Sequence, residues 1–274
     1  MPDSAICAIT AIDSHAHVFA RGLPMAARRR HRPEYDALPS EYLGQLDRCG
    51  ISHGVLVQPS FLGADNDYLL HALRQCPQRL RGVAVVEPGA GNSELEALAP
   101  DGVCGIRLNL MGLALPDVAG MRWKDLLARV RARDWHVELH CKSHELSRIG
   151  QAVIDAGCKL VVDHFGRPEA TQGAGSDGFE WLLRAADCGR VWVKLAAAYR
   201  SWPDQSGKAA CDAARTLLHA FGAERLVWGS DWPNTQHRDI VDYASTHAAL
   251  SAWVPRAADR RRILVETPTQ LFNF

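Results

Sequence analysis

Histidine and aspartate residues that could activate a water molecule recur along the chain, each beside an apolar segment. They are His15 and His17 in IDSHAHVF, His140 in HVELHC, His164 in VVDHFGRP and Asp231 in WGSDWP. A spacing of two residues directs the side chains of His15 and His17 to one face of an extended chain. Paired neutral imidazoles suit a divalent metal ion. With His140 and Asp231 they would offer three nitrogen ligands and one oxygen ligand, so the sequence predicts a site for zinc or a similar ion.

Eight short apolar segments could form the strands that carry these side chains. They are Ala8–Ser14, His53–Gln58, Arg81–Val86, Val103–Asn109, His136–Cys141, Lys159–His164, Val191–Leu195 and Leu226–Asp231. Several are almost continuous apolar runs, which is typical of parallel strands that are covered on both faces. We therefore expect one parallel sheet.

Amphipathic segments separate these strands and are expected to be helices. The clearest are Leu69–Gln75, Met121–Arg133, Glu145–Ala156 and Lys208–Phe221. The last two end immediately before glycines, the favoured residue after a helix. Regular alternation of strands and helices over 274 residues predicts an α/β fold, a TIM-type (β/α)₈ barrel that forms a single domain over residues 1–274. The Arg- and Pro-rich segment Phe19–Pro39 is expected to be a loop over the barrel mouth.

The active site of such a barrel lies at the carboxyl ends of the strands. The fourth predicted strand adds Arg107 and Asn109 to the histidines and the aspartate, and Arg167 follows the sixth. Each residue alone has a structural explanation. His140 could belong to the core, Arg107 could pair with a carboxylate in the barrel wall, and Asp231 could cap a helix. Because four strands place such residues at the same end, a shared pocket is the better interpretation.

The composition argues against several function classes. Lysine plus arginine equals aspartate plus glutamate at 31 each, so the formal net charge is zero. This balance gives no electrostatic reason to expect nucleic acid or a membrane as a partner. The basic run at residues 28–32 (RRRHR) is interpreted as a solvated loop rather than a patch for a polyanion. The remaining histidines are interpreted as structural or solvated, namely His31, His53, His71, His136, His144, His219, His237 and His247.

Cysteine usage and the N-terminal segment bear on the compartment. The eight cysteines include no Cys-x-x-Cys pair, and several lie in apolar runs, so we expect free thiols in a reducing compartment. The chain starts without a basic segment followed by a long apolar one, and no apolar run approaches the length of a membrane span. We therefore expect a cytoplasmic protein. Its oligomeric state is left as two alternatives, a monomer or a homo-oligomer.

Six segments in a fixed order carry a resemblance to a known family. IDSHAHVF, VLVQPSFLGADN, GIRLNL, VVDHFGRP, KLAAAYR and WGSDWP resemble the amidohydrolase-2 branch of the amidohydrolase superfamily, and within it the family of 2-pyrone-4,6-dicarboxylate lactonases. The likeness reaches the C-terminal ETPTQLFNF, which is similar to the family's closing helix. A His-x-His pair is shared widely, whereas VVDHFGRP followed by WGSDWP is far more specific. The resemblance implies a barrel enzyme that opens a lactone ring.

The resemblance also implies roles for individual residues. In these lactonases the paired histidines, a third histidine and an aspartate surround the lactone carbonyl and the attacking water. The matching positions are His15, His17, His164 and Asp231. The lactonases hold substrate carboxylates with arginines, and the matching positions are Arg107 and Arg200. We expect Arg167 and Asn109 to contribute to substrate binding as well.

Two departures from the lactonase pattern affect these expectations. A further lactonase arginine falls on Leu113 here, which predicts a substrate with fewer carboxylates. If a dicarboxylate were preferred, Arg21 and Arg167 would be the candidates for the missing role. The lactonases also work without metal and have a tyrosine where this chain has His140. Metal-dependent members of the superfamily use histidine there, which favours one bound divalent ion over none.

We therefore expect a hydrolase that opens a small carboxylated lactone. Arg107 and Arg200 would position the ring, a metal ion or the histidines would polarise the carbonyl, and Asp231 would take a proton from water while His164 assists. A metal-dependent decarboxylase of the same superfamily is the first alternative. A non-catalytic barrel that binds a small molecule is the second, although a binder gains little from a buried His–Asp cluster.

Overall fold

Eight parallel strands form one sheet in which each strand pairs with the next along the chain, from β1 to β8. The computed structural model describes residues 8–169, 175–202 and 207–274. The strands are β1 Ile12–Ala16, β2 His53–Val57, β3 Leu80–Ala84, β4 Val103–Asn109, β5 His136–His140, β6 Lys159–Val162, β7 Val191–Ala196 and β8 Leu226–Gly229. The predicted parallel sheet is confirmed.

The chain that follows β8 closes the sheet against β1. The backbone of Asp231 donates to the carbonyl of His15 at 2.8 Å, and the backbone of His17 donates to the carbonyl of Trp232 at 2.7 Å. A parallel bridge also joins Ala16 to Trp232. Two predicted site segments, which are 215 or more residues apart in sequence, are therefore neighbours in the barrel wall. The predicted (β/α)₈ barrel is confirmed.

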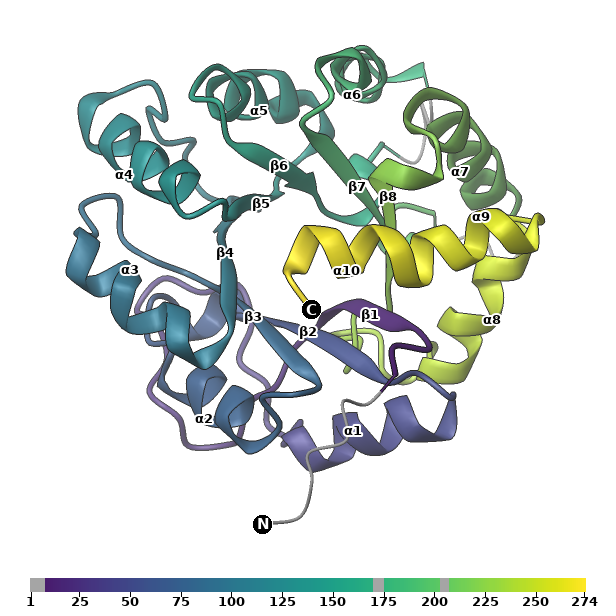
Figure 1. The fold of residues 1–274 in the computed structure, drawn as a ribbon, viewed down its shortest axis with the longest axis horizontal. Helices are drawn as coiled ribbons and strands as arrows, with labels where there is room; N and C mark the ends of the chain where they lie inside the picture. The colour runs from purple at the N-terminus through teal and green to yellow at the C-terminus, as the bar shows by residue number, and fades with distance from the viewer. Residues whose placement is uncertain (1–7, 170–174, 203–206) are drawn as a thin grey trace.

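Helices cover the outside of the barrel, as Figure 1 shows. They are α1 Pro39–Arg48, α2 Asp67–Gln75, α3 Asn92–Leu98, α4 Met121–Ala132, α5 Leu146–Asp155, α6 Asp177–Ala185, α7 Lys208–Phe221, α8 Tyr243–Trp253, α9 Ala257–Arg261 and α10 Thr267–Phe272. The four helices predicted from the sequence all form, with ends that differ by no more than two residues. None of the helices in the described ranges is long and apolar enough to cross a membrane.

The last helix, α10, lies across one end of the barrel in Figure 1, with the C-terminus above the strands. Leu271 and Phe272 pack inside the barrel against side chains of the strands, such as Ile12 and Val55. The ring of His136, at the start of β5, lies edge-on to Phe272 with the centroids 5.3 Å apart. The C-terminal segment thus fills the end of the barrel at which the strands begin, and the opposite end is left for a site.

The first strand is the one that differs most from its predicted bounds. It starts at Ile12 instead of Ala8, because the preceding backbone is tied by a side chain: Thr10 donates its N–H to the Ser52 hydroxyl at 2.9 Å. As a result His15 lies within β1, and His17 follows it directly. The seven cysteines within the described ranges are unpaired, and Cys7 lies outside those ranges.

Candidate active site

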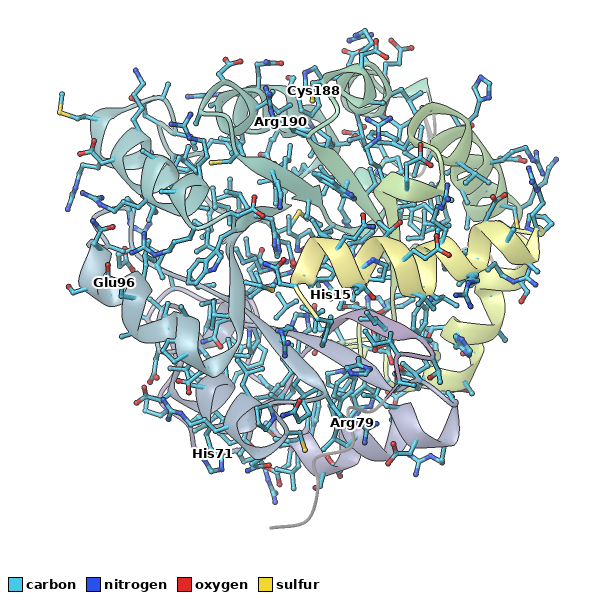
Figure 2. The ribbon with its side chains drawn as sticks, viewed as in Figure 1. His15, His71, Arg79, Glu96, Cys188 and Arg190 are labelled. Atoms are coloured by element: carbon cyan, nitrogen blue, oxygen red, sulfur yellow. The ribbon has the colours of Figure 1, made fainter. Side chains whose placement is uncertain are left out.

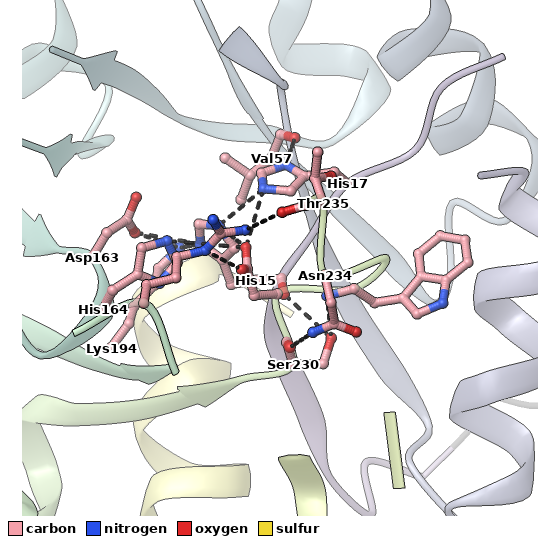
Figure 3. A network of polar contacts seen from close by, with 12 residues as sticks. His15, His17, Val57, Asp163, His164, Lys194, Ser230, Asn234 and Thr235 are labelled. Carbon is pink, nitrogen blue, oxygen red and sulfur yellow. Dashed lines mark hydrogen bonds and ion pairs between the residues drawn. The ribbon is translucent and has the colours of Figure 1, made fainter. Parts of the chain in front are cut away.

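His15, His17 and Asp231 converge at the end of the barrel opposite α10. Their facing atoms form a triangle: His15 Nε2 lies 3.3 Å from His17 Nε2, and Asp231 Oδ1 lies 3.7 Å from the first and 3.5 Å from the second. All three residues are buried. Figure 3 shows His15 and His17 together with neighbours such as Val57 and Lys194. Three of the four predicted metal ligands are therefore brought together.

A glycine lets β8 approach β1 closely enough for this arrangement. A Cβ atom on Gly229 would lie 2.5 Å from the Cβ of His15, so only glycine fits there. Two residues later the backbone of Asp231 adopts the left-handed region, with φ 57°. Few non-glycine residues adopt that region, and aspartate does so more readily than most. The turn directs the Asp231 carboxylate back toward the paired histidines.

The two oxygens of Asp231 have different surroundings. Oδ2 accepts from the Tyr199 hydroxyl at 2.6 Å and from Arg200 Nε at 2.7 Å, whereas Oδ1 faces the histidines. Burial alone would raise the pKa of Asp231, but Arg200 and the nearby histidines hold it well below its usual range. The carboxylate is therefore anionic. Its Oδ2 atom is held by two hydrogen bonds, and its Oδ1 atom can accept a hydrogen bond from water or bind a metal ion.

His164 and His140 line the same pocket. Their rings meet edge-on with centroids 4.8 Å apart, and His164 Nε2 lies 4.0 Å from Asp231 Oδ1. Burial lowers the pKa of His164 to about 3, with Arg200 contributing and Asp231 opposing. Burial, His164 and Arg107 likewise hold the pKa of His140 well below its ordinary value. Both rings are thus neutral, and each can donate one hydrogen bond.

The floor of the pocket holds a cluster of buried charges. Lys194, on β7, contacts Glu138 on β5 and lies 3.0 Å from His15 Nδ1. Asp163 Oδ1 and Glu138 Oε1 lie 3.3 and 3.4 Å from the same ring nitrogen. Burial would raise the pKa of Asp163, but His15, Lys194 and Arg107 hold it well below its usual range. Burial and Asp163 raise the pKa of Glu138 to about 8, against the opposing effect of Lys194.

The triangle of ligand atoms fits a divalent ion. Ligands on a tetrahedral zinc, each about 2.0–2.2 Å from the metal, are separated by about 3.3–3.6 Å, close to the spacing of the three atoms here. His17 donates from Nδ1 to the Val57 carbonyl at 2.7 Å, so its Nε2 atom carries no proton and has a lone pair for a metal ion. His15 Nε2 also has a free lone pair when the Nδ1–H group of the same ring donates to Asp163. His140 is not a member of either group of metal-type ligands found among the described residues; these are His15, His17, Asp231 and His15, Asp163, His164.

A second placement of protons satisfies the same contacts without an ion. If the Lys194 ammonium donates to His15 Nδ1, then His15 Nε2–H donates to His17 Nε2. In this arrangement the nitrogen that would bind a metal carries a proton.

The predicted substrate-binding residues all line the pocket, but two of them are already paired. Arg107 donates to Asp163 at 2.9 Å and lies 3.3 Å from Glu138. This is the alternative in which Arg107 pairs with carboxylates in the barrel wall. Arg200 is engaged with Asp231. Asn109 and Arg167 each have a buried polar side-chain atom without a hydrogen-bond partner among the described residues. The Nε atom of Arg107 likewise has no hydrogen-bond partner among the described residues.

The basic segment before α1 also reaches the pocket. Arg30 and His31 line it together with the predicted site residues. Arg30 is exposed, as Arg32 is, and His31 is half-buried, so the run is solvated in part while two of its residues also border the pocket. The reason is tertiary, since the loop folds over the barrel mouth. Arg21, in contrast, pairs with Asp36 at the surface.

Sequence reasoning missed four residues of this site: Glu138, Asp163, Lys194 and Tyr199. One signal was available for two of them. Glu138 and Lys194 are charged residues inside otherwise apolar strand segments, HVELH and VWVKLA. A charge in a parallel strand is expensive to bury unless it is paired. Two such charges of opposite sign therefore indicate a pair inside the barrel.

Comparison with known proteins agrees with this geometry. The amidohydrolase family model matches residues 12–274. A 4-sulfomuconolactone hydrolase of Rhizobium radiobacter is 30% identical, over 95% of this chain and 89% of that protein. A Pseudomonas putida protein assigned as a 2-pyrone-4,6-dicarboxylic acid hydrolase is 46% identical, with a TM-score of 0.91 over 97% of this chain and 98% of that one.

A second solved structure comes from Acinetobacter baumannii. It is assigned as a 2-pyrone-4,6-dicarboxylic acid hydrolase and has citric acid bound. It is 35% identical, with a TM-score of 0.93 over 96% of this chain and 99% of that one. Since the family match spans the whole barrel and includes every residue of the buried cluster, the chain belongs to the amidohydrolase family, in the branch that holds these lactone hydrolases.

Proposed function

We propose that the protein hydrolyses the ring ester of a small carboxylated lactone. The observation that carries this proposal is the pairing of an anionic Asp231 with a neutral His164 in one pocket whose other lining residues include four arginines. Such a site can hold an anionic substrate, activate water on one side and donate a hydrogen bond to a carbonyl on the other. The names of the relatives support the same substrate class.

In the proposed reaction, guanidinium groups and Asn109 bind a substrate carboxylate and orient the ring. Asp231 accepts the hydrogen bond, and then the proton, of the attacking water at Oδ1. His164 donates a hydrogen bond to the carbonyl oxygen as negative charge develops there. Water adds to the carbonyl carbon, the ring C–O bond breaks, and the ring oxygen leaves with a proton.

We also propose one divalent ion, zinc by ligand type, held by His15, His17 and Asp231. Such an ion would supply a Lewis acid for the carbonyl. Elemental analysis of protein purified without chelator or affinity metal tests this, followed by assay after exhaustive chelation. Stoichiometric metal and loss of activity are expected. Substoichiometric metal with full activity would leave the histidines to polarise the carbonyl by themselves.

The reaction itself is tested with 2-pyrone-4,6-dicarboxylate and related lactones. Loss of the ring absorbance, together with a product heavier by one water, is the expected result. Asp231→Asn should lower kcat by at least about a hundredfold, because general-base catalysis contributes roughly 10²–10⁴-fold. Asp212→Asn is the matched control, since that carboxylate is exposed and, within the described ranges, its ion pair is with Arg215 on the same helix. Release of carbon dioxide without ring opening would instead indicate a decarboxylase, and binding without turnover a non-catalytic barrel.

A further inference from the structure

One ring nitrogen of His15 lies among three ionisable side chains in the floor of the pocket. The Nδ1 atom is 3.0 Å from the Lys194 ammonium, 3.3 Å from Asp163 Oδ1 and 3.4 Å from Glu138 Oε1. All four residues are buried, and Figure 3 shows Asp163 and Lys194 beside His15. A neutral imidazole carries one proton, so Nδ1 can accept from the lysine or donate to a carboxylate, but it cannot do both.

Each of the two proton positions on His15 satisfies a group that the other leaves without a partner. When Nδ1 accepts from Lys194, the buried oxygens Asp163 Oδ1 and Glu138 Oε1 have no hydrogen-bond partner among the described residues. When Nδ1 carries the proton, it can donate to Asp163 Oδ1, and Lys194 keeps its contact with Glu138. A buried polar group without a partner costs free energy, so the two arrangements are in competition. The shorter distance favours the lysine in the metal-free protein.

The other ring nitrogen of His15 belongs to the proposed metal site. His15 Nε2 lies 3.3 Å from His17 Nε2 and 3.7 Å from Asp231 Oδ1. If Nδ1 accepts from Lys194, the ring proton is on Nε2, and this nitrogen cannot bind an ion. If Nδ1 donates to Asp163, Nε2 has a free lone pair and can be a ligand. The side chain that pairs with Nδ1 therefore determines whether His15 can take part in metal binding.

Charge acts in the same direction as the hydrogen bonds. Lys194 is a buried cation in contact with His15, and like charges repel more strongly away from water, so it disfavours a second cation on that ring. Asp163 is a buried acid whose Oδ2 atom is paired with Arg107 at 2.9 Å, while its Oδ1 atom is left for His15. Both effects of Lys194 oppose a bound ion, and both effects of Asp163 favour one.

We propose that Lys194 and Asp163 compete for His15 Nδ1, and that this competition sets the affinity of the site for a divalent ion. Asp163 strengthens the binding of the ion and Lys194 weakens it, so a complete set of ligand atoms does not by itself give tight binding. Both are positioning residues, because they act through His15. This proposal deepens the proposed function and rests on the ion placed there, but it is measured by metal binding and by the position of a proton, without turnover.

The first test titrates zinc into the full chain after exhaustive chelation, in competition with a coloured chelator of known affinity. Lys194→Met should lower the Kd for zinc at least about tenfold, and Asp163→Asn should raise it at least about tenfold, because the partner of a metal-binding histidine typically contributes about 10–100-fold. Lys159→Met is the matched control. It also removes a lysine from an ion pair, with Asp134 at 2.7 Å, but Lys159 is level with His136 at the opposite end of the barrel. The control should leave the Kd for zinc unchanged.

Two further measurements keep the test independent of the stability of one variant. Lys194→Met leaves Glu138 without its cation, so the double variant Lys194→Met/Glu138→Gln removes both members of the buried pair. It should show the same gain in zinc affinity. Nitrogen-15 NMR of the metal-free protein should place the His15 proton on Nε2 in the wild type and on Nδ1 in Lys194→Met, with His15→Gln used to identify the signals. A lysine that only stabilised the fold would not move this proton.

The proposal is overturned if both Lys194 variants bind zinc no more tightly than the wild type, or if the His15 proton of the metal-free wild type is on Nδ1. Failure of the proposed resident ion looks different: the wild type would take up no zinc while Lys194→Met binds it stoichiometrically, which upholds the competition. Conversely, tight zinc binding by the wild type that Lys194→Met leaves unchanged would uphold the ion and refute the competition.

Discussion

Acid should destabilise the protein in part through His136, a histidine far from the proposed chemistry. The side chain is fully buried at the start of β5 and packs against Phe272 of α10. Burial lowers its pKa from 6.5 to about 3, and the charges of Lys194 and Lys159 contribute. The folded protein therefore holds His136 neutral at a pH where the unfolded chain would protonate it.

The sign and the size of the effect follow from proton linkage. The unfolded state binds one more proton than the folded state between the two pKa values, so stability is complete above pH 6.5 and falls as the pH drops. Each pH unit in this range costs about 1.4 kcal/mol per such histidine, so the loss between pH 6.5 and 4.5 is about 3 kcal/mol. A domain's total stability is about 5–15 kcal/mol. One histidine thus accounts for a substantial share of acid sensitivity.

Replacing His136 with phenylalanine removes the titration and keeps a ring against Phe272. Urea unfolding at pH 7 and pH 4.5 should show that the free energy of unfolding drops by about 3 kcal/mol less in the variant than in the wild type. His136→Gln serves as a second variant in case the larger ring does not fit. His71→Gln is the control, because His71 lies at the periphery on α2, as Figure 2 shows. An unchanged pH dependence in both His136 variants would refute the reasoning.

Three further results are expected. Lys194→Met should lower the free energy of unfolding, measured in urea at pH 7, by about 3–5 kcal/mol, because it leaves buried acidic groups without their cation. A decrease of less than about 1 kcal/mol would contradict the buried pairing. Tyr199→Phe should lower kcat/KM on a carboxylated lactone by about tenfold to a hundredfold, because Asp231 loses a charge-assisted hydrogen bond worth about 1.5–3 kcal/mol, and unchanged kinetics would argue against this positioning role. Gly178→Ala should destabilise the protein by more than 1 kcal/mol in thermal or urea unfolding, because a Cβ there would overlap the carbonyl of Ser143; wild-type stability would show that the helix can shift.

The sequence alone was sufficient for the barrel and for the convergence of the candidate site residues near its mouth. The strands are apolar runs of the right length, and a barrel that is covered by helices outside and filled by side chains inside demands that pattern. His15, His17, His164 and Asp231 could be placed together because each follows or ends such a run, and parallel strands present their carboxyl ends at one face. These inferences need only local periodicity and one topological rule.

The tertiary structure alone decided which charges meet. Lys194 and His15 are 179 positions apart and touch only because the sheet closes. Arg30 lies in a segment without periodicity, so nothing local distinguishes it from Arg32, and its packing on Gly112 places it at the edge of the pocket. Electrostatic pairing depends on distances across the barrel, which strand patterns do not encode. The sequence therefore determines the scaffold and the ends of its strands, whereas the pairing of charges inside the site follows from long-range contacts.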